Sequence, residues 1–159
     1  MKARLVLFLL CLSFLSGCFQ KVRLYPVSGP LSFRTPPPIY AAKIAGAFKA
    51  GNISATLENG EVCKGSWEAV SNRPTSNSNP STSNVTSPDM TSAWDAVYGQ
   101  GYYVAHVLGT RLHIHGVLNG DQGTILHVDA YRTEDANGDL NTPRGVAVDN
   151  KGNTYKMAF

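Results

Sequence analysis

Short runs of alternating apolar and polar residues, separated by turns rich in glycine and asparagine, recur through most of this chain. The clearest case is NISATLENGEVCKGSW, in which Asn59 and Gly60 separate two such runs. An Asn-Gly pair between alternating runs is the strongest short-range signal for a β-hairpin. The pattern predicts an all-β fold, a small antiparallel β-barrel or sandwich built from hairpins. Further turns are expected at 109–110, 119–123 and 150–152.

Helical patterns are weak by comparison. No stretch after residue 20 has apolar residues at helical spacing over the length of an ordinary helix. Two segments leave a helix open as an alternative. Residues 37–50 are rich in alanine, which favours helix, and residues 92–99, SAWDAVYG, have room for a helical turn.

The first 17 residues have the layout of a secretory signal peptide. Lys2 and Arg4 precede a nearly unbroken apolar run over 5–15. This run is too short to span a bilayer, but it has the length of the apolar region of a signal peptide. The segment 1–17 is therefore expected to be removed from the mature protein.

The signal ends in Leu15-Ser16-Gly17-Cys18, which resembles the lipobox of bacterial lipoproteins. The resemblance covers only the first 18 residues. It implies that Cys18 carries a diacylglycerol and an N-acyl chain, and two or three such chains hold a protein stably on a membrane. Enterobacterial-type lipoproteins kept in the inner membrane tend to have aspartate at the next position. Phe19 stands there instead, which favours the outer membrane.

The rest of the chain is expected to form one domain with a tether and a long loop. Residues 18–38 form the lipidated N-terminus and a proline-rich tether, because the triple proline 36–38 favours an extended conformation. The segment 23–27 within it has the alternative of an edge strand. Residues 39–159 form a single β domain. Its segment 71–92 consists mainly of Ser, Asn, Thr and Pro, which predicts a disordered loop.

Charge and cysteine content limit the partners. Without Lys2 and Arg4 the 14 basic residues become 12, against 11 acidic ones. Such a balance gives no support for nucleic-acid binding. The expected partners are the membrane, through the lipid anchor, and a protein or glycan of the envelope. Cys63 remains as the single unmodified cysteine, so no internal disulfide is expected and a buried thiol is the favoured interpretation.

The four histidines of the chain, His106, His113, His115 and His127, lie close together and Asp129 follows them. Side chains alternate between two faces along a strand, and parity places all five on one polar face of a three-stranded meander. A symmetric turn centred on residue 121 places His115 opposite His127 and His113 opposite Asp129. A turn at 109–110 places His106 opposite His113.

Such a cluster has the donors of a zinc site. The His-x-His pair with a third histidine on the next strand resembles, as a constellation only, the zinc site of carbonic anhydrase. Zinc would take three nitrogens and leave one position for water, with Asp129 as a fourth ligand or an orienting group. Against this interpretation, the face opposite the apolar core is expected to be solvated, and exposed histidines need no ligand. No other cofactor is expected.

No nucleophile elbow, phosphate-binding loop or dinucleotide fingerprint is present, so no catalytic residue is assigned and an enzyme is disfavoured. The overall pattern resembles that of small all-β outer-membrane lipoproteins. The favoured function is therefore a lipid-anchored envelope lipoprotein with a non-catalytic structural or binding role. The alternative is a metal-binding protein or zinc-dependent hydrolase that uses the histidine cluster.

Overall fold

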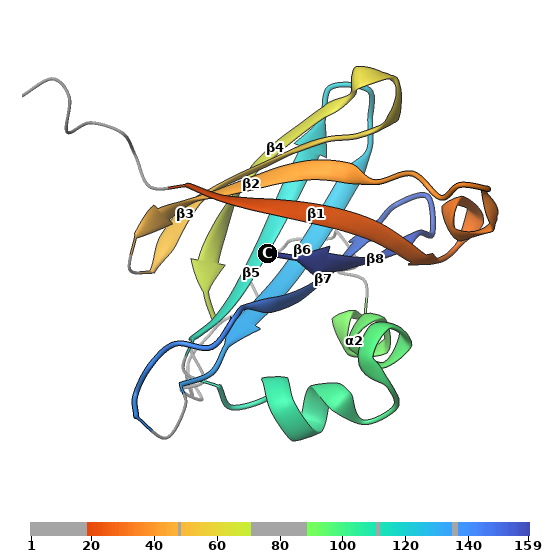
Figure 1. Cartoon of the computed structure of the whole chain (residues 1–159). Helices are drawn as coiled ribbons and strands as arrows, with labels where there is room; N and C mark the ends of the chain where they lie inside the picture. Colours follow the sequence, from red (N-terminus) through yellow and green to blue (C-terminus); the bar gives the residue numbers. More distant parts are fainter. Residues whose placement is uncertain (1–18, 48, 71–88, 111, 135–136) are drawn as a thin grey trace, which may run out of the picture.

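Eight strands pair in sequence order and the last pairs with the first, so the sheet closes into an antiparallel barrel (Figure 1). The structure is a computed structural model that describes residues 19–47, 49–70, 89–110, 112–134 and 137–159. The predicted all-β class is confirmed, and the barrel is the architecture adopted. The strands are β1 (Phe19–Ser28), β2 (Tyr40–Ala47), β3 (Ala50–Thr56), β4 (Val62–Ala69), β5 (Leu112–Gly120), β6 (Ile125–Arg132), β7 (Arg144–Asp149) and β8 (Thr154–Ala158).

Apolar side chains that alternate along the strands fill the barrel. An eight-stranded barrel has an interior just wide enough for side chains. Trp67 lies over Gly51 of the neighbouring strand, and its indole N–H donates to the carbonyl of Ala45 in β2 at 3.0 Å. Gly51 makes the contact possible, because a Cβ there would lie 2.5 Å from the Trp67 Nε1. The main buried members of the core are Val22, Leu24, Tyr40, Ile53, Trp67, Leu118, Leu126, Val128, Tyr155 and Met157.

The direction of the strands gives the barrel two different ends. Because successive strands run in opposite directions, the connections β1–β2, β3–β4, β5–β6 and β7–β8 all lie at one end, which we call the mouth end. Phe19 and the connections β2–β3, β4–β5 and β6–β7 lie at the other, which we call the terminal end. Two short 3-10 helices, η1 (Pro30–Phe33) and η2 (Glu58–Gly60), belong to the mouth end.

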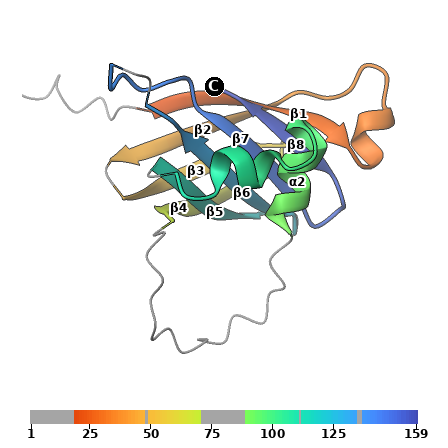
Figure 2. The ribbon, with the colours of Figure 1, turned by 90° about the horizontal axis from the view of Figure 1, so that it is seen from below.

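Two helical segments in the β4–β5 connection pack outside the barrel, over β6, β7 and β8 (Figure 2). The α-helix α2 (Met90–Tyr98) begins at Asp89, whose side chain accepts a hydrogen bond from the Thr91 N–H at 3.0 Å. The π-helix η3 (Tyr103–Val107) follows it. Trp94 and Val107 are completely buried between these helices and the sheet, so the barrel has a second apolar cluster on its outer surface.

The hairpin predictions are confirmed at three of four turns. Strands pair across the turns at 59–60, 119–123 and 150–152, and the alanine-rich segment 37–50 supplies β2 rather than a helix. The turn at 109–110 is wrong as a hairpin turn, because residues 103–107 before it are helical. The helical alternative for SAWDAVYG is the one adopted, in α2.

The N-terminal segment differs from the expected tether over 18–38. Phe19–Ser28 forms β1, which pairs with both β2 and β8, so these residues belong to the barrel. Pro26 is accepted next to a register irregularity between β1 and β8, where a missing N–H is tolerated. The segment expected as a loop over 71–92 falls outside the described residues up to 88, and its last three residues belong to α2.

The expected signal peptide and Cys18 also lie outside the described residues. Within the part of the chain that is described, no helix is long and apolar enough to cross a membrane. All eight strands and the closing pair of β1 with β8 lie within Phe19–Ala158, so residues 19–159 contain the complete barrel.

Candidate functional site

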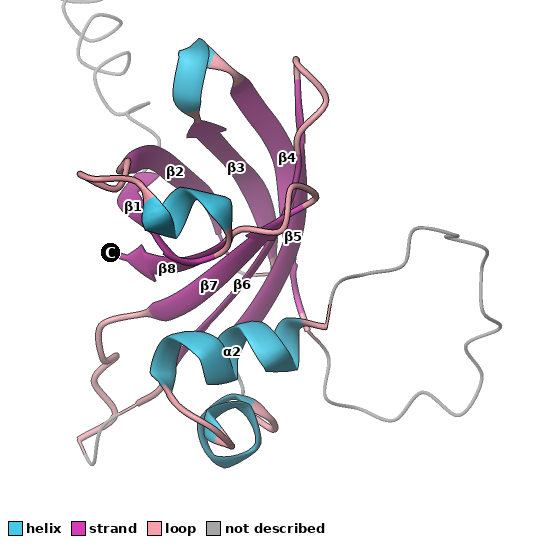
Figure 3. Ribbon diagram, turned by 90° about the vertical axis from the view of Figure 1, so that its right-hand side faces the viewer, coloured by secondary structure: helices cyan, strands magenta, loops and turns pink. Residues whose placement is uncertain are grey.

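The turns of the mouth end surround a cavity of about 310 Å³. Figure 3 looks onto this end, with η1 in front of the barrel and α2 outside it below. The lining comes from all four connections, including Leu31 of η1, Asn59 of η2, Gln122 between β5 and β6, and Lys151 between β7 and β8. The cavity is thus a product of the closed topology rather than of any one segment.

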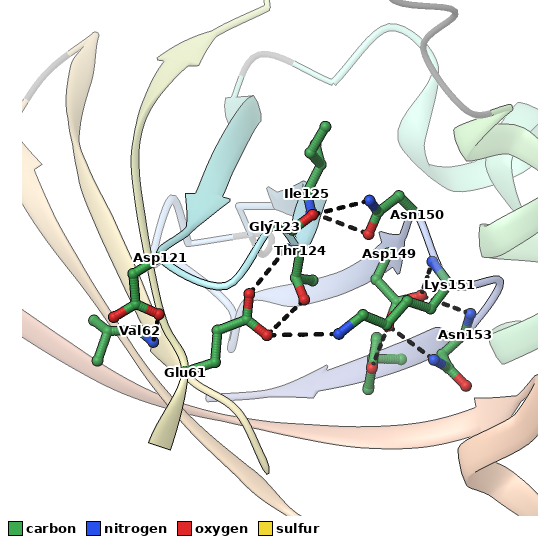
Figure 4. A network of polar contacts seen from close by, with 11 residues as sticks. Glu61, Val62, Asp121, Gly123, Thr124, Ile125, Asp149, Asn150, Lys151 and Asn153 are labelled. Carbon is green, nitrogen blue, oxygen red and sulfur yellow. Dashed lines mark hydrogen bonds and ion pairs between the residues drawn. The ribbon is translucent and has the colours of Figure 1, made fainter. Parts of the chain in front are cut away.

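Glu61, at the end of the β3–β4 turn, contacts both the β5–β6 turn and the β7–β8 turn. It is buried, with 3 % of its surface exposed. Its carboxylate accepts hydrogen bonds from the N–H of Thr124 at 2.8 Å and from the Thr124 hydroxyl at 2.6 Å (Figure 4). The Lys151 ammonium lies 3.5 Å from the same carboxylate. The Thr124 hydrogen bond is the main cause that lowers the pKa of Glu61, so the group is a carboxylate at neutral pH.

Asp149 accepts hydrogen bonds from residues of its own turn, between β7 and β8. One oxygen accepts from the N–H groups of Lys151 and Asn153, at 2.9 and 2.8 Å. The other accepts from the Asn153 amide at 2.8 Å (Figure 4). It also accepts from the Tyr155 hydroxyl at 2.7 Å. Burial, followed by the hydrogen bond to Asp149, raises the pKa of Tyr155. Both buried carboxylates of the mouth are therefore occupied by partners within the chain.

The charges at the rim are also paired, which leaves neutral polar groups to face the cavity. Arg34 forms an ion pair with Glu58 across the rim. Tyr40 lines the cavity, and burial, followed by the charge of Glu58, raises the pKa of its hydroxyl, which therefore stays protonated. The side-chain amides of Asn59 and Gln122 complete a set of donors and acceptors. Such a lining suits a small uncharged polar ligand.

The histidines predicted as a site lie elsewhere, on the outside of the barrel wall. His113, His115, His127 and Asp129 share the outward face of β5 and β6, as strand parity predicts. The predicted register is wrong by two residues, because His115 pairs with Asp129 and His127 pairs with Val117. A two-residue slip keeps every side chain on its face, which is why the cluster survives.

Asp129 is the centre of this cluster. Its Oδ1 accepts from the Nε2–H of His113 at 2.6 Å and from the indole N–H of Trp94 at 3.1 Å. His115 Nδ1 lies 3.8 Å from the other oxygen. Burial by itself raises the pKa of Asp129, but the hydrogen bonds from His113, His115 and Trp94 outweigh it and lower the pKa below its ordinary value. Asp129 is therefore an acceptor, and His113 is its donor.

His127 is the unusual member, because its Nδ1 is buried without a hydrogen-bond partner. Its ring centre lies 6.2 Å from that of His115. Burial, followed by the nearby His115, lowers the pKa of His127. The imidazole is therefore held in its neutral form in a place that does not solvate a charge.

Most of this face is buried, whereas the sequence predicts a solvated face; only the His115 side chain keeps substantial exposure, at 31 %. Trp94 of α2 is fully buried against it and stacks on Tyr98, with ring centres 5.3 Å apart. Tyr102 continues the stack and its hydroxyl lies 2.7 Å from that of Tyr131. His113 is 3 % exposed and Asp129 is 4 % exposed under this cover. The helices thus convert a polar sheet face into an interior with its own hydrogen bonds.

His106 does not join the other histidines. It lies on η3, outside any strand, and its ring contacts that of Tyr102 with centres 4.6 Å apart. Among the described residues, no group of three or more His, Cys, Asp or Glu side chains converges in the arrangement of a metal site. Cys63 is completely buried in the barrel, and burial, followed by the charge of Glu61, raises the pKa of its thiol to about 11.

The mouth residues Tyr40, Glu61 and Asp149 had no place among the sequence-predicted sites. Each lies in or beside a different hairpin turn, and only barrel closure brings the turns together. The one local signal is the series of Asx and Glx residues in three of the four turns, at 58–61, 121–122 and 150–153. The chain is matched by no protein-family model, no curated protein and no solved structure.

Proposed function

We propose that this chain is a lipid-anchored envelope protein, acylated at Cys18 and held in the outer membrane, whose barrel is a non-catalytic binding module. The binding site is the cavity at the mouth end. The observation that supports this arrangement is the distance between the start of β1 and the mouth. β1 has ten residues, which span roughly 30 Å in an extended strand.

Anchoring at Cys18 would place the bilayer beside Phe19, at the terminal end. The mouth lies at the far end of β1, so the cavity would face away from the bilayer towards soluble or wall-bound partners. A non-catalytic role agrees with the buried carboxylates of the mouth, since Glu61 and Asp149 are both fully engaged in hydrogen bonds within the chain. Catalytic acids and bases need a free position toward the substrate.

The ligand class follows from the lining of the cavity. Tyr40 offers a ring and a neutral hydroxyl, while Asn59 and Gln122 offer amide donors and acceptors. The charges that lie nearby are paired with each other. This combination favours an uncharged carbohydrate unit of an envelope glycan over an ionic ligand.

The anchor is tested by metabolic labelling of the full chain with radioactive palmitate. We expect label in the wild type and none in Cys18→Ala, which retains the rest of the signal. Labelling of both chains, or of neither, would refute acylation at Cys18.

The mouth is tested by calorimetry of residues 19–159 with a panel of neutral and N-acetylated disaccharides. Loss of one neutral hydrogen bond in Tyr40→Phe should weaken binding about fivefold, which corresponds to about 1 kcal/mol. Tyr25→Phe is the matched control, because Tyr25 lies on β1, the strand next to that of Tyr40, but does not line the cavity. Absence of saturable binding by every sugar, or equal loss in both variants, would reject the mouth as a glycan site.

A second candidate, zinc binding, is favoured by one observation, the unpartnered Nδ1 of buried His127 beside His115. Zinc calorimetry on residues 19–159 tests it, with His127→Ala and His115→Ala as variants. His106→Ala is the control, because His106 lies on η3. Binding that is unchanged in the first two variants would exclude these imidazoles as ligands.

A further inference from the structure

A groove on the outer surface of β2, β3 and β4 begins at Phe19, the residue that follows Cys18. It has a volume of about 570 Å³ and is open to solvent. Phe19 is 51 % exposed at its edge, and the Lys43 ammonium lies 5.5 Å from the centre of the Phe19 ring. The groove is therefore next to the point at which the proposed anchor would enter the bilayer.

Register across the three strands builds the floor of the groove. Lys43 pairs with Ser54, and Ser54 pairs with Lys64, so the serine lies between two lysines in one row. In the neighbouring row, Asn52 pairs with Ser66. Strands in a sheet are about 4.8 Å apart, so the Cα atoms of the two lysines are roughly 10 Å apart. Both ammonium groups can reach one anion placed over the serine.

The charge of this row is unbalanced. Lys21 of β1 pairs with Lys43, which extends the row to three lysines. None of the described residues that line the groove is acidic, and neither Lys43 nor Lys64 forms an ion pair within the described part of the chain. An unpaired cationic row with hydroxyl and amide donors is the chemistry that binds phosphate groups.

We propose that this groove binds the headgroup of an anionic phospholipid in the membrane that holds the anchor. This inference rests on the proposed lipid anchoring, because the anchor is what brings the groove to the bilayer. The headgroup phosphate lies over Ser54 between Lys43 and Lys64, and Phe19 enters the interfacial region. Clustered lysines with an adjacent exposed aromatic ring are typical of surfaces that contact anionic bilayers.

The test uses residues 19–159, which contain the complete barrel but no lipid, so that its outcome is independent of acylation at Cys18. Binding is measured by sedimentation with vesicles of phosphatidylcholine containing 30 % phosphatidylglycerol, and with vesicles of phosphatidylcholine alone. We expect binding to the anionic vesicles only. Each lysine near such a surface contributes about fivefold, so Lys43→Gln with Lys64→Gln should weaken binding about 25-fold.

Two controls keep the interpretation specific. Lys156→Gln removes an exposed lysine of β8, on the side covered by α2, and should leave vesicle binding unchanged. The Lys43→Arg, Lys64→Arg variant should restore it. No binding to anionic vesicles, or equal loss in Lys156→Gln, would overturn the proposal. Binding of inorganic phosphate by calorimetry, without any binding to vesicles, would reject the lipid and assign the groove to a soluble phosphate compound.

Discussion

Replacement of Trp94 by phenylalanine separates the hydrogen bond under α2 from the packing around it. The phenyl ring keeps most of the stack with Tyr98 and Tyr102, but it has no N–H to donate to Asp129. A hydrogen bond to a charged group contributes about 1.5–3 kcal/mol. With a small loss of buried surface, the free energy of unfolding should fall by about 2–3 kcal/mol.

The assay is urea unfolding of residues 19–159, followed by circular dichroism and by tryptophan fluorescence, to which Trp67 of the barrel core contributes in every variant. At roughly 4 °C per kcal/mol for a domain of this size, the same loss lowers the Tm by about 8–12 °C. Tyr98→Phe is the matched control, because its hydroxyl makes only a long contact of 3.5 Å to the Gly145 carbonyl. Its cost should be below about 0.5 kcal/mol.

A double-mutant cycle with Asp129→Ala, which removes the acceptor, decides whether the hydrogen bond is the cause. Residues in contact show coupling, whereas independent sites add within about 0.5 kcal/mol. We expect a coupling energy of at least about 1 kcal/mol between Trp94→Phe and Asp129→Ala. Additive effects of the two changes would refute the assignment of this stability to the indole N–H.

Three further predictions concern titratable groups. The pKa of Asp129 is lower in the folded protein than in the unfolded chain, so its contribution is complete above the unfolded value of about 3.9 and is lost as the pH falls through the folded value. The stability advantage of the wild type over Asp129→Asn, measured by urea unfolding, should therefore shrink below about pH 4, and an advantage that grows there would contradict the lowered pKa. The pKa of His127 is also lowered, so the folded protein favours the neutral imidazole, which is lost on acidification. The wild type should therefore lose stability relative to His127→Phe from about pH 7.5 to 5, and parallel pH profiles of the two chains would contradict this prediction. Cys63 is buried and its thiol has a pKa of about 11, so it should resist a thiol reagent at pH 8 in native residues 19–159. It should react at once in concentrated urea, whereas rapid labelling of the native protein would show that the barrel opens at β4.

Hairpins and faces could be predicted from the sequence because both depend on local alternation. The hairpin at 59–60 follows from an Asn-Gly pair between two alternating runs. The shared face of His113, His115 and Asp129 follows from the alternation of side chains along a strand. The exact pairing of His115 could not be predicted. Gly120 donates to the Thr124 carbonyl, and Thr124 is held by Glu61 from another hairpin, so long-range contacts accompany the register at this turn.

The helices α2 and η3 could not be predicted as a cover of the sheet, because their sequence has both helical and turn signals. Aromatic side chains recur at every fourth position, which places them on one side of a helix: Trp94, Tyr98, Tyr102 and His106. In the structure the first three rings stack, and the His106 ring lies tilted against Tyr102. Gly99 and Gly101, both with positive φ, interrupt this series and resemble turn residues of a hairpin. These helices determine whether the histidine face is exposed, because they bury His113 and Asp129, which strand parity alone would leave in solvent.

The pairing of β1 with β8 joins residues from the two ends of the described chain, for example Leu24 with Met157. Contacts between such distant positions form late, since the chain must first give up the entropy of the long loop between them. Until Thr154–Ala158 is in place, β1 and β7 each present a free edge that can pair with another chain. The last five-residue strand is therefore the step that removes both aggregation-prone edges, and a chain shortened before Thr154 would keep seven strands but remain open.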